Sequence, residues 1–356
     1  MSMKISSIID ANEKRVAIIP DTVKKYIALG FEIVLPKDFG KSAGFSDNDY
    51  ISAGAKITNE PVSEADIYLC VHPTLSDSNY QKIKKGAHLI ALLSPFQQKE
   101  VLDKMAGAGI NLYALEKVPR ITRAQSMDVL SSQANIAGYK AMLDAMSIYG
   151  RVIPMMMTAA GTIRPAKVMI LGAGVAGLQA IATAKRFGAI VSANDVRASA
   201  KEQVESLGAS FISMETANAE SSDGYAKEMS EEDKKRQQEK LAQIISSMDI
   251  ILTTAQIPGK LAPRLVTKQM IETMSSGTVI VDMATETGGN CELSEKDKIV
   301  STSNGVIIVG YTDFPARVAT DSSRLFAKNV LNFVTLMLKD GSLNLEDEII
   351  KTTKIS

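Results

Sequence analysis

The residues best suited to chemistry are three glycines, Gly172, Gly174 and Gly177, which form the pattern Gly-x-Gly-x-x-Gly after an apolar run. The run is expected to be a strand, and apolar residues at helical spacing follow. In such a turn the first glycine allows a sharp bend, the second lets a pyrophosphate approach the backbone, and the third lets the helix pack on its strand. The N–H groups and dipole of that helix then face the phosphates. The pattern predicts a dinucleotide-binding turn.

A second apolar run ends in Asp195, close to the offset of about 20 residues expected for the carboxylate that holds the ribose hydroxyls. A carboxylate there repels a ribose 2′-phosphate, which favours NAD over NADP. Arg197 weakens that preference, because an arginine nearby is how NADP is accommodated. A plain tight turn is the alternative, and the strand, helix and acidic residue together disfavour it.

Polar residues are also dense in the segment 118–133, which contains Arg120, Gln125, Asp128 and Ser131. The segment lies between an expected strand and a helix over about 131–148. A loop of this kind beside a cofactor domain is a candidate site. The alternative is a solvated connection in which Asp128 or Ser131 caps the helix.

Strands and helices alternate along the chain, which predicts α/β architecture with two Rossmann-like, doubly wound parallel sheets. We expect an N-terminal domain over 1–130 plus about 315–356, without its own nucleotide, and an NAD-binding domain over about 138–312. Met155–Met157 are expected in a buried link between them. The polar stretch 215–229 is longer than a usual connection and is expected to be a lid.

Composition excludes several classes of function. The 356 residues carry 40 basic and 40 acidic side chains, so no overall charge favours nucleic acid or an anionic membrane. Two cysteines and two histidines make neither a disulfide framework nor a credible zinc site. No apolar stretch reaches the length of a membrane span, and we expect a reducing, cytosolic compartment.

A family resemblance rests on five segments, 120–128, 172–180, 195–197, 224–229 and 286–290. Together they resemble the NAD-binding alpha subunit of proton-translocating NAD(P) transhydrogenase, and the likeness covers nearly the whole chain. The wider group includes alanine dehydrogenases of similar two-domain build.

The resemblance implies a role for each matching residue. Arg120, Asp128 and Ser131 would orient the NAD nicotinamide and its carboxamide, and Gln125 would reach towards NADP on a partner subunit. The nucleotide itself would contact three further groups: Val175, Ala176 and Gly177 at the pyrophosphate; Asp195, Val196 and Arg197 around the adenosine ribose; and Gln256 in the cleft, with Gly224, Tyr225 and Gln237 in a closing loop and helix.

The alanine dehydrogenase alternative needs substrate-binding and acid/base residues. In that family an arginine near the N-terminus and a lysine hold the substrate, and a histidine after the fourth strand is the acid/base. Arg15 matches the arginine, the lysine region reads Val71-His-Pro73, and the histidine position holds Leu92. His88 lies earlier, inside an expected strand, and is interpreted as structural. We therefore expect no acid/base group there.

The resulting expectation is a subunit that binds NAD(H) and passes hydride to NADP(H) on a partner, coupled to proton translocation. Its partners would be membrane-spanning and NADP-binding subunits and a second copy of itself. It would lie in the cytoplasm, attached peripherally to the inner membrane through those partners. The alternatives are an NAD-dependent amino-acid dehydrogenase and a non-catalytic NAD-sensing protein.

Overall fold

The computed structural model describes residues 2–10, 12–59, 63–74, 83–214, 231–257, 260–339 and 341–356. The chain divides into two compact units, Met1–Gln133 with Pro315–Ser356, and Ala134–Phe314. The first boundary falls inside the long helix α5 (Val129–Tyr149), and the second falls inside the short 3₁₀ helix η5 (Phe314–Val318). Each unit is an α/β fold around its own sheet.

The first unit is built on a six-stranded sheet in the order β3-β2-β1-β4-β5-β6. All neighbouring strands are parallel, as the alternation of strands and helices predicts. The strand order reverses between β1 and β4. The strands are β1 (Lys4–Ser6), β2 (Glu32–Pro36), β3 (Lys56–Thr58), β4 (Ile67–Leu69), β5 (His88–Ala91) and β6 (Asn111–Ala114).

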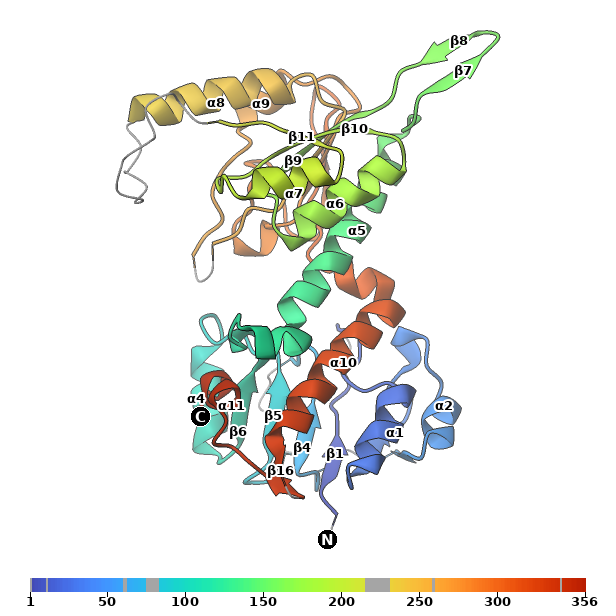
Figure 1. The fold of residues 1–356 in the computed structure, drawn as a ribbon, viewed down its shortest axis with the longest axis vertical. Helices are drawn as coiled ribbons and strands as arrows, with labels where there is room; N and C mark the ends of the chain where they lie inside the picture. Colours follow the sequence, from blue (N-terminus) through green and yellow to red (C-terminus); the bar gives the residue numbers. More distant parts are fainter. Residues whose placement is uncertain are drawn as a thin grey trace. The chain divides into compact units, whose positions relative to one another are not determined.

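Helices cover both faces of this sheet. Alternate strand residues point to opposite faces, so Ile67 joins one apolar core and Tyr68 joins another. Helix α10 buries Phe326 and Phe333 in the first core and crosses that face of the sheet in Figure 1. The helices are α1 (Pro20–Ala28), α2 (Asp47–Ser52), α4 (Lys99–Gly107), α10 (Ala319–Met337) and α11 (Glu348–Thr353), with the short 3₁₀ helices η1 (Lys41–Ala43), η2 (Leu115–Lys117) and η3 (Thr122–Met127).

The second unit contains a seven-stranded sheet in the order β11-β10-β9-β12-β13-β15-β14. The sheet is parallel except at its edge, where β14 runs antiparallel to β15. Strand β9 lies near the centre, and the strand order reverses between it and β12. The strands are β9 (Lys167–Leu171), β10 (Ile190–Asn194), β11 (Ser210–Phe211), β12 (Ile250–Thr253), β13 (Val279–Asp282), β14 (Ile299–Ser301) and β15 (Ile307–Val309).

The central strands of this unit are buried on both faces. Val168 and Ile170 pack with one set of helices, and Met169 and Leu171 pack with another. Such strands read as continuous apolar runs, as the fingerprint strand does. The helices are α6 (Val175–Arg186), α7 (Ala200–Ser206), α8 (Glu231–Ile245) and α9 (Lys268–Glu272), with part of α5 and the short 3₁₀ helix η4 (Thr285–Thr287).

One interpretation of the sequence is wrong. Met155–Met157 do not form a buried link, because all three side chains are exposed and Met157 is 74 % accessible. The chain here makes a hairpin of β7 (Met156–Thr158) and β8 (Gly161–Ile163), which projects away from the seven-stranded sheet of its unit (Figure 1). Apolar composition alone had suggested burial, and it does not distinguish a core segment from an exposed arm.

The remaining chain adds two small features. The strands β16 (Leu338–Lys339) and β17 (Ser342–Leu343) form a hairpin between α10 and α11. Among the described residues, no helix combines the length and the hydropathy that a bilayer span requires. The stretch 215–229, expected to be a lid, lies outside the described residues.

Candidate functional site

The glycine turn lies at the carboxyl end of β9 and leads directly into α6. Gly172 has a φ of +104°, a left-handed conformation that favours glycine. A Cβ on Gly177 would lie 1.9 Å from the Gly172 carbonyl oxygen, so only glycine lets the helix come this close. At Gly174 a Cβ would meet no described atom within 4 Å. Packing explains Gly172 and Gly177, whereas the space in front of Gly174 is open to a ligand.

The N-terminus of α6 carries no side-chain cap, because its N-cap residue is Gly174. The first N–H groups of a helix have no acceptor within that helix, so those at Val175 and Ala176 are available to an anion. The Val175 side chain is 42 % exposed, which leaves this end of the helix accessible. The helix has 12 residues, and its positive dipole end therefore adds to the attraction for a phosphate.

Asp195, just after β10, holds the turn from the other side. Its carboxylate accepts hydrogen bonds from the backbone N–H groups of Ala173 (2.7 Å) and Arg197 (2.9 Å). It also accepts from Arg197 Nε (2.9 Å) and Nη2 (3.1 Å). A carboxylate has about four lone-pair sites, so donors of this chain occupy all of them.

Two opposing effects set the charge of Asp195. Burial favours the neutral acid, but the hydrogen bonds from Arg197 and Ala173 outweigh it and hold the pKa of Asp195 below its ordinary value. The group is therefore ionised at neutral pH. Its neighbour Arg197 is 56 % exposed, and Val196 is 99 % exposed. An outside donor would reach Asp195 only if the exposed Arg197 side chain turned away.

Two loops at the carboxyl ends of β12 and β13 are fastened to this turn. Thr254 Oγ1 donates to the Gly172 carbonyl at 3.0 Å. Asn290 accepts from the Ala255 N–H at 3.0 Å and donates to the Ala255 carbonyl at 2.8 Å. Both backbone groups of Ala255 are thus bonded, its N–H and its carbonyl. These bonds fix the loop that presents the exposed Gln256.

The chain just after Asn290 is held by a buried carboxylate at the end of β13. Asp282 is fully buried and accepts from the Cys291 N–H at 2.9 Å and from Ser294 Oγ at 2.7 Å. Reasoning from the sequence assigned no role to Asp282 or Asn290, although Asn290 ends one of the segments that carry the family resemblance. The signal was available in the buried strand that ends in Asp282 and in the turn residues Gly288-Gly289-Asn290.

Gly138 is a further residue that the sequence did not reveal. It lies on α5, where a Cβ would come within 2.0 Å of the Ala176 carbonyl oxygen at the start of α6. Two helix backbones therefore meet directly at this point, and Gly138 sets the position of the first turn of α6. A glycine inside an expected helix was the available signal.

The polar segment of the first unit forms η3 and the start of α5. The side chains of Arg120 and Gln125 are exposed, with no hydrogen bond or ion pair to any residue that the structure describes. Asp128 precedes α5 and accepts from the Ser131 N–H at 2.9 Å and from Ser131 Oγ at 2.6 Å. Asp128 thus caps the helix, as one of the two interpretations proposed, while Arg120 and Gln125 remain available to a ligand.

The structure describes one of the three residues expected in the closing loop and helix. Gly224 and Tyr225 lie outside the described residues. Gln237 lies on α8 and is half-buried.

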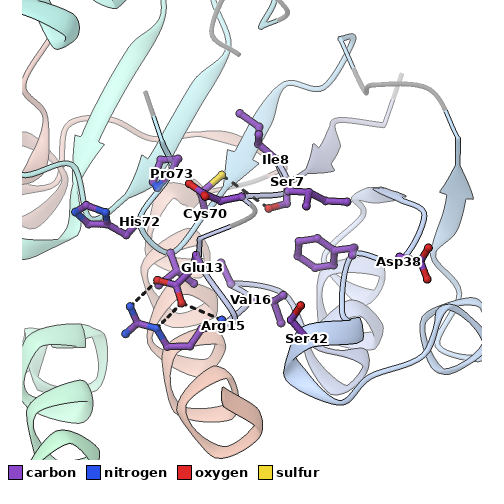
Figure 2. A pocket seen from close by; sticks show the side chains of 15 residues that line it. Ser7, Ile8, Glu13, Arg15, Val16, Asp38, Ser42, Cys70, His72 and Pro73 are labelled. Carbon is purple, nitrogen blue, oxygen red and sulfur yellow. Dashed lines mark hydrogen bonds and ion pairs between the residues drawn. The ribbon is translucent and has the colours of Figure 1, made fainter. Parts of the chain in front are cut away.

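The first unit has a small cavity where its strand order reverses, at the carboxyl ends of β1 and β4 (Figure 2). Its volume is about 50 Å³, small beside the roughly 150 Å³ of a cavity that holds benzene. Arg15 faces the carboxylate of Glu13 in this cavity, with Nε and Nη2 at 2.9 and 2.7 Å from its oxygens. Arg15 Nη1 also donates to Gln133 at 2.8 Å. The guanidinium is therefore neutralised and fixed by its own chain.

The family's acid/base position holds Leu92, but another histidine lies at this cavity. His72 lines the cavity, although it follows β4 rather than β5, and its Nε2 lies 3.2 Å from Ser94 Oγ. By contrast, His88 stacks on Tyr113 at the opposite, amino end of β5. Burial, followed by the charge of Lys354, lowers the pKa of His88, as expected for a structural histidine.

Two family models match this chain. The family model "Alanine dehydrogenase/PNT, N-terminal domain" matches residues 6–137, and "Alanine dehydrogenase/PNT, C-terminal domain" matches residues 141–355. The chain is 48 % identical over 352 residues to an NAD(P) transhydrogenase subunit alpha protein of Rickettsia prowazekii, covering 97 % of this chain and 92 % of that protein.

The chain is also similar to a solved transhydrogenase structure and, less closely, to an alanine dehydrogenase. The crystal structure of transhydrogenase from Sinorhizobium meliloti matches with a TM-score of 0.89 and 45 % identity, covering 99 % of this chain and 98 % of that one. Alanine dehydrogenase 1 of Staphylococcus aureus is 28 % identical over 345 residues, covering 92 % of this chain and 85 % of that protein.

Proposed function

This chain belongs to the alanine dehydrogenase/PNT family, and from that premise we propose that it is the NAD(H)-binding alpha subunit of a proton-translocating NAD(P) transhydrogenase. The match to transhydrogenase alpha subunits extends over nearly the full length of both partners, at much higher identity than the match to alanine dehydrogenase. The proposed reaction is hydride transfer from bound NADH to NADP held on a partner subunit.

The observation that carries nucleotide binding is the open space at Gly174 in front of an uncapped helix N-terminus. A pyrophosphate fits there because no Cβ intervenes and free N–H groups face it. The ionised Asp195 supports NAD rather than NADP, since a 2′-phosphate beside it would place like charges together. We propose that Val175, Ala176 and Gly177 contact the pyrophosphate, and that Asp195, Val196 and Arg197 surround the ribose.

The nicotinamide, when bound, supplies the hydride, and this chain's residues supply its position. Direct transfer between two nicotinamide rings leaves no proton to be moved at the reacting carbons, so placement of the rings is the main requirement. Arg120, Asp128 and Ser131 would orient the ring and its carboxamide, and Gln125 would reach the second nucleotide. The side chains of Arg120 and Gln125, which bond no residue that the structure describes, support this assignment. Gln256, Gln237, Gly224 and Tyr225 are proposed to line and close the nucleotide site.

The proposed partners are the NADP-binding and membrane-spanning subunits of the complex, which would hold this chain at the cytoplasmic face of the inner membrane. Its relatives in Rickettsia prowazekii and Rhodospirillum rubrum are named as one portion of a subunit alpha, and such a name indicates an assembly of several chains. A second copy of the chain is a further proposed partner. Its support is the hairpin of β7 and β8, whose exposed side chains include Met157 and Ile163.

Gln125→Asn tests the proposed reaction. Shortening this side chain by one methylene should reduce hydride transfer to NADP on the added partner by about 10- to 100-fold, because a misplaced reacting group costs about that much. NADH binding, measured by fluorescence, should persist in the variant. The exposed Lys117→Ala, nearby in the same unit, is the control.

The alternative functions give different results in the same preparation. The isolated chain should bind NADH and should not oxidise alanine, because Glu13 neutralises Arg15 and the adjoining cavity is small. Robust alanine oxidation would establish a dehydrogenase instead. NADH binding without any hydride transfer to the partner's NADP would leave a nucleotide-sensing protein.

A further inference from the structure

The polar loop of the first unit is braced by elements from the far end of the chain. Its backbone is contacted by α10, and its charged side chain Arg123 is contacted by the residue that caps α11. Arg123 Nη1 and Nη2 donate to the two oxygens of Asp347 at 2.6 and 3.1 Å. Such a paired geometry fixes direction as well as distance. The loop therefore depends on residues 203 or more positions away in the sequence.

Asn329 of α10 makes the central contact. Its Nδ2 donates to the Ser126 carbonyl at 2.7 Å, and its Oδ1 accepts from Ser132 Oγ at 2.7 Å. One amide thus spans the segment from Ser126 to Ser132, and this segment contains Asp128 and Ser131. Asn332, one turn further along the helix, donates to the same Ser126 carbonyl at 3.0 Å.

The chemistry of this contact suits an amide. An amide offers a donor and an acceptor side by side on a short stem, so Asn329 bonds the Ser126 carbonyl and the Ser132 hydroxyl at once. Asn329 is 9 % exposed, so its bonds face little competition from water, and a missing partner would be costly there. The amide is also held by a long helix with an apolar core face, which makes it a rigid reference point.

We propose that Asn329 is a positioning residue for hydride transfer: it clamps both ends of the segment 126–132 and so fixes the direction of Asp128 and Ser131 at the nicotinamide. This inference rests on the proposed function, since it assigns Asn329 a role in that same reaction. Asn329 acts through the segment and does not touch the nucleotide. Asn332 and the pair of Arg123 with Asp347 assist it.

The test uses the full chain assembled with its NADP-binding partner. Asn329→Asp preserves size but places an oxygen against the Ser126 carbonyl in place of a donor. Its kcat for hydride transfer should fall by about 10- to 100-fold while the NADH dissociation constant stays unchanged. Asn332→Ala removes a solvent-accessible contact and leaves the apolar core intact. It should lower kcat by less than Asn329→Asp does. Lys328→Ala, exposed on the same helix, is the control and should behave as wild type.

A second readout is independent of activity. The Ser131 N–H donates to Asp128, and its hydrogen exchange should accelerate in Asn329→Asp but not in Lys328→Ala. Wild-type kcat in Asn329→Asp, or faster exchange throughout the whole unit, would overturn the proposal. If the wild-type complex itself transfers no hydride, the proposed function fails, and the exchange of Ser131 still decides whether Asn329 clamps the segment.

Discussion

At the scale of single residues, the nucleotide site depends on Asp195 more than the fingerprint pattern implies. The pattern assigns this carboxylate to the ribose, but in the structure it also holds the Ala173 N–H inside the glycine turn. Arg197 completes the arrangement with three donors. Asp195 is therefore both a proposed ligand contact and a support for the turn.

Asp195→Asn should lower the affinity for NADH. It should also lower the free energy of unfolding, by an amount that depends on pH. Because the folded pKa of Asp195 lies below its ordinary value, the ionised form stabilises the native state. This contribution is complete above the unfolded pKa, about 3.9, and is lost as the pH falls through the lower folded pKa. Urea unfolding should therefore separate wild type from variant at pH 6, and the gap should narrow as the pH falls below about 4.

The control for this experiment is Asp103→Asn, at an exposed position on α4. It should leave the unfolding free energy unchanged across the same pH range. A gap between wild type and Asp195→Asn that stayed constant from pH 6 to pH 3 would contradict the assignment.

At the scale of elements, the glycine turn combines one position that packing determines with one that it does not. Gly177 lets α6 rest against the turn, whereas Gly174 faces open space. The two glycines look equivalent in the sequence, but the structure gives them separate causes. One substitution at each of the two glycines tests these two causes separately.

Gly174→Ala should weaken NADH binding by tenfold or more while stability stays within about 1 kcal/mol, the cost of alanine at an N-cap. The added methyl group enters the space in front of the turn and touches no described part of the protein. Gly177→Ala should instead destabilise the chain by about 1–3 kcal/mol, because its Cβ overlaps the Gly172 carbonyl. Calorimetry and NADH titration measure the two effects, and equal stability losses would contradict them.

The sequence predicted the elements whose signals are local. The strand, turn and helix around Gly172 follow from apolar periodicity and glycine spacing, and the two parallel sheets follow from alternation. The sequence did not predict the contacts that connect distant segments. Asn290 bonding to Ala255, and Gly138 meeting Ala176, depend on which loops the folded sheet brings together, and no local pattern encodes that.

At the scale of the whole molecule, the hairpin of β7 and β8 is the clearest departure from expectation. A two-stranded hairpin is marginally stable alone in water, and this one exposes Met157 and Ile163. Its base is secured by Arg164, whose guanidinium donates to both oxygens of Asp249 at 2.7 and 2.9 Å. A firmly anchored apolar arm is typical of a surface that another chain covers.

Met157→Asp should therefore weaken association between copies of the chain. Burying a methionine side chain contributes about 1.5–3 kcal/mol, so its loss should raise the dimer dissociation constant by at least tenfold. Sedimentation equilibrium measures this constant directly. Ile299→Asp, an equal change at an exposed position on β14, should leave it unchanged. A dimer that tolerated Met157→Asp would have its interface elsewhere.

The saturated carboxylate of Asp195 has a consequence for turnover. In the proposed function, an arriving ribose would gain only the difference between two sets of hydrogen bonds, because it would replace those that Arg197 already makes. The arginine can swing into water and return, since more than half of its side chain is exposed. If the chain works as proposed, this exchange of partners would keep the ribose from being held too tightly, which suits a subunit that must replace its oxidised nucleotide in every cycle.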